Sequence, residues 1–109
     1  MRDRKVATRY AEALMMTAKA EGVLDGVAES FAAVLAAVKD NAELRIFMDS
    51  PQVRTEEKKE LIEKVFGDQV EPVLLGFFML LLDKNRIENT RDIGEVFAEL
   101  VEADKGVQH

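Results

Sequence analysis

The residue types that could carry catalysis are few in this sequence, and none is arranged as a catalytic site. The single histidine, His109, is the last residue, where a solvated side chain is the ordinary state. Ser30 falls inside an expected amphipathic helix and Ser50 precedes a proline, with no histidine base nearby in the sequence and no nucleophile elbow. The glycines are scattered and form no common phosphate-binding loop. The sequence has no cysteine, which excludes disulfides, thiolate metal sites and cysteine nucleophiles.

Carboxylates are plentiful, but in the richest stretch they alternate with lysines. This stretch holds Glu56, Glu57 and Glu60 together with Lys58, Lys59 and Lys64. The pattern is typical of a solvated helix face with i,i+4 pairs. We therefore expect neither acid–base catalysis nor a metal here, and we predict that the chain is not an enzyme and uses no cofactor.

Length and composition indicate one folded domain. A chain of 109 residues can bury one core, and 48% hydrophobic with 33% charged residues argues against disorder. The formal net charge of −6 argues against a nonspecific nucleic-acid binder. The first twenty residues are charged and lack the continuous apolar core of a secretory signal. We expect a reducing, cytoplasm-like location.

Helical periodicity covers nearly the whole chain, with Pro51 and Pro72 as the only prolines. We predict an all-α, compact six-helix bundle with short turns. The expected helices run from about Lys5 to Glu21, from about Asp25 to Asp40–Asn41, from Ala42 to Met48, from a Thr55 cap through Phe66, from Pro72 through the apolar run, and from an Asn89 or Thr90 cap to the end. Gly22 is a plausible terminator of the first. The fourth helix carries four apolar residues on one side, Leu61, Ile62, Val65 and Phe66, and the sixth carries a stripe of Ile93, Val96, Phe97, Leu100 and Val101.

The run from Val73 to Leu82 contains no charged residue and is followed by Asp83. Ten helical residues reach roughly 15 Å, about half the hydrocarbon thickness of a bilayer, so this is not a membrane span. A helix that is apolar on all sides must be covered on all sides. A chain this small covers one helix only partly, which leaves a stripe for a partner.

Helical wheels divide two of the expected helices into two apolar stripes each. In the fifth helix, Leu74, Phe78, Leu81 and Leu82 suffice as a core face, and Val73, Gly76, Phe77 and Leu80 lie opposite. In the first helix, Ala7, Ala11, Leu14, Met15 and Ala18 form one stripe, and Val6, Tyr10, Ala13, Thr17 and Ala20 form another. Two spare stripes could line a groove for an amphipathic partner helix anchored at i, i+3, i+4 and i+7. The alternative is that other helices of the bundle cover both stripes.

Several stretches, in order and spacing over nearly the whole chain, resemble the delta subunit of bacterial and chloroplast rotary ATP synthases, the oligomycin-sensitivity-conferring protein of mitochondria. The matching stretches are Arg9 to Leu14, Phe47 to Val53, Glu57 to Lys59, Phe77 to Ile87, and finally Ile93, Phe97 and Leu100. Each stretch is weak alone, and their order makes the resemblance specific.

The resemblance implies a non-catalytic stator subunit. Its N-terminal domain is a six-helix bundle on top of the catalytic head, with the N-terminal helix of an alpha subunit in a groove between its first and fifth helices. Its C-terminal domain grips the b subunit of the peripheral stalk, on the cytoplasmic face of the bacterial membrane, without membrane insertion or nucleic acid. The implied partner-binding residues are Tyr10, Ala13 and Leu80, to which the wheels add Val6, Thr17, Val73, Gly76 and Phe77.

The sequence departs from the family pattern in length and at two positions. Family chains are roughly twice this domain-sized length. We therefore expect residues 1–105 to be the N-terminal domain and 106–109 to start a connector to a C-terminal domain absent from this chain. Gly76 stands where many relatives carry a polar residue, and Asn85 replaces the usual glycine before Arg86 and tolerates a left-handed turn.

Two other functions compete with the stator. A helical RNA-binding domain, of the kind found in antitermination factors, would use the basic cluster Arg2, Arg4, Lys5 and Arg9. Its affinity would fall steeply with salt, whereas an apolar groove would be nearly indifferent. A generic helical adaptor would bind a different partner peptide, and a peptide panel separates it from the stator.

Overall fold

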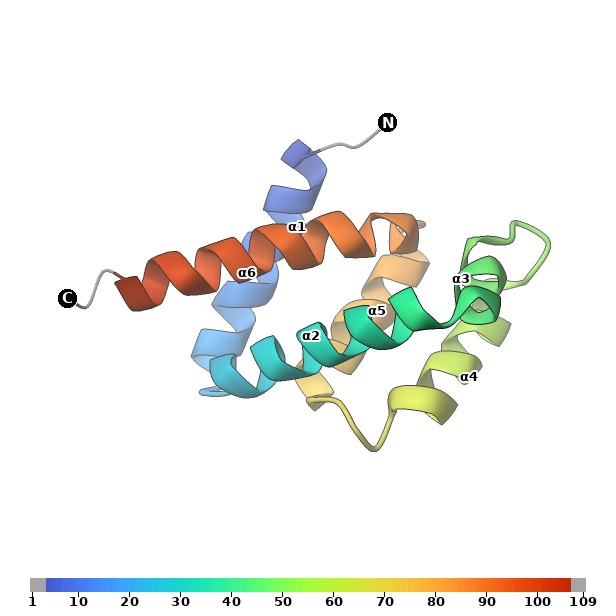
Figure 1. Ribbon diagram of the computed structural model, residues 1–109, viewed down its shortest axis with the longest axis horizontal. Coiled ribbons are helices and arrows are strands. Elements are labelled where there is room, and N and C mark those ends of the chain that lie inside the picture. The colour runs from blue at the N-terminus through green and yellow to red at the C-terminus, as the bar shows by residue number, and fades with distance from the viewer. Residues whose placement is uncertain (1–3, 107–109) are drawn as a thin grey trace.

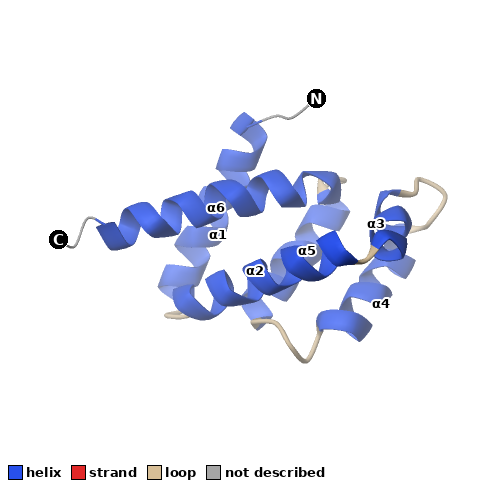
Figure 2. Cartoon of the chain, in the orientation of Figure 1, coloured by secondary structure: helices blue, strands red, loops and turns tan. Residues whose placement is uncertain are grey.

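The computed structural model describes residues 4–106, and every regular element in that range is helical (Figures 1 and 2). The elements are α1 (Arg4–Ala20), α2 (Leu24–Asp40), α3 (Ala42–Asp49), α4 (Thr55–Phe66), α5 (Pro72–Asp83), the 3-10 helix η1 (Ile87–Asn89) and α6 (Thr90–Gly106). This confirms the all-α class and the six-helix bundle. The histidine and the first basic residue considered above, His109 and Arg2, lie outside the described residues, as do positions 107–109 of the expected connector.

Two left-handed residues end helices where the sequence suggested that they would. Gly22 has φ +72°, and the N–H of Val23 donates to the Ala18 carbonyl at 2.9 Å, which closes the end of α1. Asn85 has φ 58°, and the N–H of Arg86 donates to the Leu81 carbonyl at 2.7 Å in the same way. The chain can therefore turn sharply after both helices.

The helix starts differ more from expectation. Thr55 is not the cap of α4 but its first helical residue, and Arg54 is the cap. The backbone N–H of Arg54 donates to Glu57 Oε1 at 3.1 Å. The carboxylate in the first turn of α4 therefore provides the hydrogen-bond acceptor for the N–H of the residue just before the helix. Helix α6 begins at Thr90, directly after Asn89 at the end of η1, so its start falls at the two residues proposed for the cap. The Thr90 hydroxyl donates to the Ile87 carbonyl.

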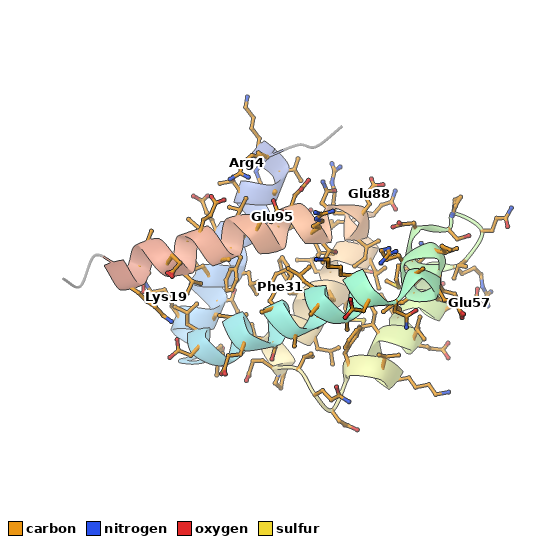
Figure 3. The ribbon with its side chains drawn as sticks, viewed as in Figure 1. Arg4, Lys19, Phe31, Glu57, Glu88 and Glu95 are labelled. Atoms are coloured by element: carbon orange, nitrogen blue, oxygen red, sulfur yellow. The ribbon has the colours of Figure 1, made fainter. Side chains whose placement is uncertain are left out.

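An aromatic cluster occupies the centre of the core. The Phe31 ring, on α2, lies with its centroid 5.6 Å from that of Phe78, 5.8 Å from Phe97 and 6.5 Å from Phe77. Phe31 is 2% exposed and is labelled in the middle of the molecule in Figure 3. One side chain therefore joins α2, α5 and α6.

Helices α1 and α6 form the most extensive contact between elements (Figure 1). Ala7, Ala11 and Ala18 are fully buried on α1, so small side chains let the helices approach closely. Ion pairs at the two ends of α1, Arg4–Glu99 and Lys19–Asp104, each measure 3.0 Å. The core stripe predicted for the first helix is thus the face that α1 buries.

Helix α6 also approaches α2 closely. A Cβ at Gly94 would lie 2.6 Å from Leu35 Cδ1 and 3.1 Å from Phe31 Cε1. Only glycine fits there without displacing core side chains. The predicted α6 stripe is buried at Ile93, Val96, Phe97 and Val101, and half-buried at Leu100.

Helix α4 buries less than its pattern suggests. Ile62 and Phe66 are buried and Leu61 is half-buried, but Val65 is 40% exposed, so the four-residue stripe is too wide. Within the described chain, the ion pairs of α4 join Arg54 to Glu57 and Lys59 to Asp83 of α5, at 3.5 and 2.6 Å. The expected i,i+4 pairs within the helix are not formed there. The Lys59–Asp83 pair instead ties α4 to the end of α5.

Candidate functional site

A groove of about 290 Å³ opens between α1 and α5. Its walls are almost entirely apolar. The Thr17 hydroxyl donates to the Ala13 carbonyl of its own helix at 3.1 Å, so its proton is not free for a ligand. The lining residues are Ala13, Leu14 and Thr17 from α1, with Pro72, Val73, Gly76, Phe77 and Leu80 from α5. The groove therefore offers shape and apolar surface rather than reactive groups.

Six of the eight predicted partner-binding residues line this groove: Ala13, Thr17, Val73, Gly76, Phe77 and Leu80. The other two, Val6 and Tyr10, are half-buried further along α1. Tyr10 packs edge-on against Phe77, with ring centroids 6.4 Å apart, so it supports the groove wall. The structure thus brings the predicted stripes of α1 and α5 together.

Two lining residues, Leu14 and Pro72, were not predicted. The wheel assigned Leu14 to the core stripe, and it is indeed 2% exposed, but it borders both core and groove. For Pro72 the sequence indicated only that it begins a helix, which it does. Each is a helical neighbour of a predicted residue, Leu14 beside Thr17 and Pro72 beside Gly76, and the i,i+3 and i,i+4 spacings were the signals that could have found them.

Phe77 differs most from its predicted position. The wheel placed it on the outward stripe, yet it is only 7% exposed. Its ring packs against Phe31 and Tyr10, from two other helices, and these contacts bury it. Phe77 therefore forms the floor of the groove and belongs to the core as well.

Gly76 and Leu80 form the open part of the groove. A Cβ at Gly76 would meet no other atom of residues 4–106 within 4 Å, apart from its own helix backbone and chain neighbours. Leu80 is 42% exposed, unusually so for a leucine in a helix this apolar. The bundle's own helices thus leave this part of α5 uncovered, contrary to the alternative in which they cover both stripes.

Several of the residues considered for other chemistry are engaged in structural contacts. The hydroxyl of Ser30 accepts the N–H of Glu71 at 3.0 Å and joins α2 to the start of α5. Arg4 is paired with Glu99, and Lys5 also has an interaction partner. Two of the four basic residues of the cluster therefore have partners, whereas Arg9 is exposed and Arg2 lies outside the described residues. Residues 4–106 contain no group of three or more potential metal ligands.

A larger hollow, about 660 Å³, lies where α3, α4 and η1 meet α2 and α6. Sequence reasoning did not anticipate it. Its floor includes the core residues Leu44, Ile62 and Phe66. On its rim, Arg45 donates to the Val38 carbonyl at 2.7 Å and Arg91 pairs with Glu95. The hollow is therefore a junction between helices in which two of the lining arginines are held by contacts within the bundle.

No helix within residues 4–106 is both long and apolar enough to cross a membrane.

The described residues thus form an all-α bundle with an open, largely apolar groove between α1 and α5. The sequence model of the ATP synthase delta (OSCP) subunit family matches residues 6–109. The chain belongs to this family.

Curated relatives named ATP synthase subunit delta agree with this assignment. The protein of Acetivibrio thermocellus is 38% identical over 102 residues, covering 94% of this chain and 57% of the relative. That of Synechococcus sp. is 40% identical over 96 residues, covering 88% and 53%. That of Carboxydothermus hydrogenoformans is 33% identical over 106 residues, covering 97% and 59%. The chain spans a little over half the length of these relatives.

Proposed function

We propose that this chain is the non-catalytic stator domain of an ATP synthase delta subunit, and that its groove binds the N-terminal helix of an alpha subunit on top of the catalytic head. The observation that carries this proposal is the uncovered strip of α5 at Gly76 and Leu80, facing α1 across the groove. An amphipathic helix buries its apolar face in such a groove. The eight predicted partner-binding residues are proposed as its contacts and supports.

The mechanical role follows from the nature of the groove. A stator holds the catalytic head against the torque of the rotor, which requires slow dissociation and no chemistry. Apolar burial gives affinity without any reacting group, and dissociation is the step that apolar contacts chiefly slow. The groove between α1 and α5 supplies such burial.

The remaining assignments extend the same proposal. Residues 1–105 would form the N-terminal domain, and the stretch from 106 would lead toward a second domain that grips the b subunit of the peripheral stalk. The structure carries α6 through Gly106, one residue beyond the boundary expected. The complex would place this domain at the cytoplasmic face of the bacterial membrane, as a peripheral component without nucleic acid or cofactor.

Gly76 gives a prediction in which stability and binding change in opposite directions. Glycine in a helix interior costs about 1 kcal/mol relative to alanine, and the position has room for a methyl group in the free domain. Gly76→Ala should therefore raise the free energy of unfolding by about 1 kcal/mol in urea titrations. It should weaken helix binding by about tenfold, because the methyl group occupies space that a docked backbone needs. Unchanged binding would show that the partner does not approach Gly76.

The test of the proposed function is a calorimetric titration of this domain with a peptide. The peptide comprises about twenty N-terminal residues of the cognate ATP synthase alpha subunit, which form a helix of about 30 Å. We expect one-to-one binding, a negative heat-capacity change, and an affinity that changes by less than about threefold between low and high salt. A single-stranded RNA titration is the comparison. Absence of peptide binding, or salt-sensitive RNA binding in its place, would contradict the stator assignment.

A further inference from the structure

The charges at the two ends of the groove give it a direction. Helices α1 and α5 run antiparallel, since Tyr10 meets Phe77 while the later Thr17 lines the groove with the earlier Pro72 (Figure 1). The start of α1 therefore lies beside the end of α5. In Figure 3, Arg4 and Lys19 mark the opposite ends of α1.

The end formed by the start of α1 and the end of α5 is basic. Arg9, Lys84 and Arg86 are exposed there. Among the other charges near this end, Arg4 pairs with Glu99 and Asp83 pairs with Lys59. Glu12, three residues after Arg9 on α1, is an exposed acid, and the three basic residues outnumber it. The nearest acid after α5, Glu88, lines the other hollow.

The opposite end is acidic. Glu21 and Asp68 are exposed there. Glu71, at the start of α5, is half-buried, and its carboxylate lies beside Gly26 of α2 rather than in the groove lining. The neighbouring charges again form pairs, Lys19 with Asp104 and Lys105 with Asp25. The dipoles of two antiparallel helices oppose each other, so these side chains determine the polarity of the groove.

We infer that the groove binds its partner helix in one direction, with the partner's acidic end over Arg9 and Lys84 and its basic end over Glu21 and Asp68. Stable helices favour acidic residues in the first turn and basic residues in the last. Such a helix matches the groove only when it lies parallel to α1. This inference rests on the proposed function and adds the charge pattern and direction of the partner.

The apolar walls and the charged ends have separate effects. Apolar contacts bind a helix equally well in either direction when its stripe is regular. Exposed charges add little affinity, but opposite charges speed association and like charges disfavour the wrong arrangement. The ends therefore select direction while the walls hold the helix.

The test uses a synthetic amphipathic helix with a regular leucine stripe, glutamates in its first turn and lysines in its last. A nitroxide label on its N-terminus should broaden the amide signals of Arg9 and Lys84 but not those of Glu21 and Asp68. A label on its C-terminus should reverse the pattern. Broadening of both ends by either label, or the opposite pattern, would overturn the inference.

A charge-reversal pair supplies a second measurement. The double variant Arg9→Glu with Lys84→Glu should bind this peptide about threefold more weakly than the original chain. Lys39→Glu with Lys64→Glu makes the same change in net charge at exposed positions on α2 and α4, helices that do not line the groove, and should change binding less than about twofold. Equal effects of the two pairs would overturn the directional inference alone. Failure of every peptide to bind would overturn the proposed function with it.

Discussion

Replacing Leu80 with aspartate should lower the affinity for the alpha-subunit helix at least about a hundredfold, because a docked helix would bury the carboxylate without a partner. The fold should survive, since Leu80 is 42% exposed in the free domain and the new carboxylate can stay in water. The measurement is the same calorimetric titration, with thermal unfolding of the variant as the check on folding.

Ala13→Asp tests the other wall of the groove. Ala13 is exposed on α1 and lines the groove opposite α5, so a carboxylate there should also prevent docking. Ala98→Asp is its matched control, because Ala98 is an exposed helical alanine on α6, outside the groove lining. We expect the control to bind as the original chain does. If Leu80→Asp and Ala13→Asp both keep full affinity, the partner does not occupy this groove.

The largest effect on stability should come from Phe31→Ala. The ring is 2% exposed and contacts three other phenylalanines, from α5 and α6. Removing such a side chain costs about 3–5 kcal/mol, a large part of the roughly 5–15 kcal/mol that stabilises a small domain. The midpoint of thermal unfolding should fall by more than about 10 °C, measured by circular dichroism.

Phe47→Ala is the matched comparison, since it deletes the same atoms from a half-buried position on α3. We expect a loss of about 1 kcal/mol there. Equal losses at the two positions would mean that the aromatic cluster around Phe31 is not the centre of the core.

Local chemistry in the sequence was enough to locate most helix ends. Gly22 and Asn85 adopt the left-handed conformation that ends α1 and α5, and Pro72 opens α5 where its missing N–H costs nothing. These signals are readable because each depends on one residue and its immediate neighbours. The cap of α4 was misassigned because Glu57 reaches back to the N–H of Arg54, an interaction between residues three apart.

Helical periodicity located the buried faces less completely. The core stripe of α1 and that of α6 are buried nearly as predicted, because long amphipathic helices repeat their pattern several times. Val65 was wrongly assigned to a buried stripe and Phe77 to an exposed one. In a helix that is apolar all round, periodicity does not indicate which face is buried. Phe77 is buried because its ring packs against Phe31 and Tyr10.

The sequence by itself determined the helical class, the ends of most helices, and two helices with spare apolar stripes, because these follow from residue type and short-range spacing. Only the tertiary structure decided that the stripes face one another across an open groove. That outcome depends on contacts between residues more than fifty positions apart, such as Tyr10 with Phe77, and on the empty space beside Gly76. The pairing of Arg4 with Glu99 is decided in the same way, by where α6 packs on α1.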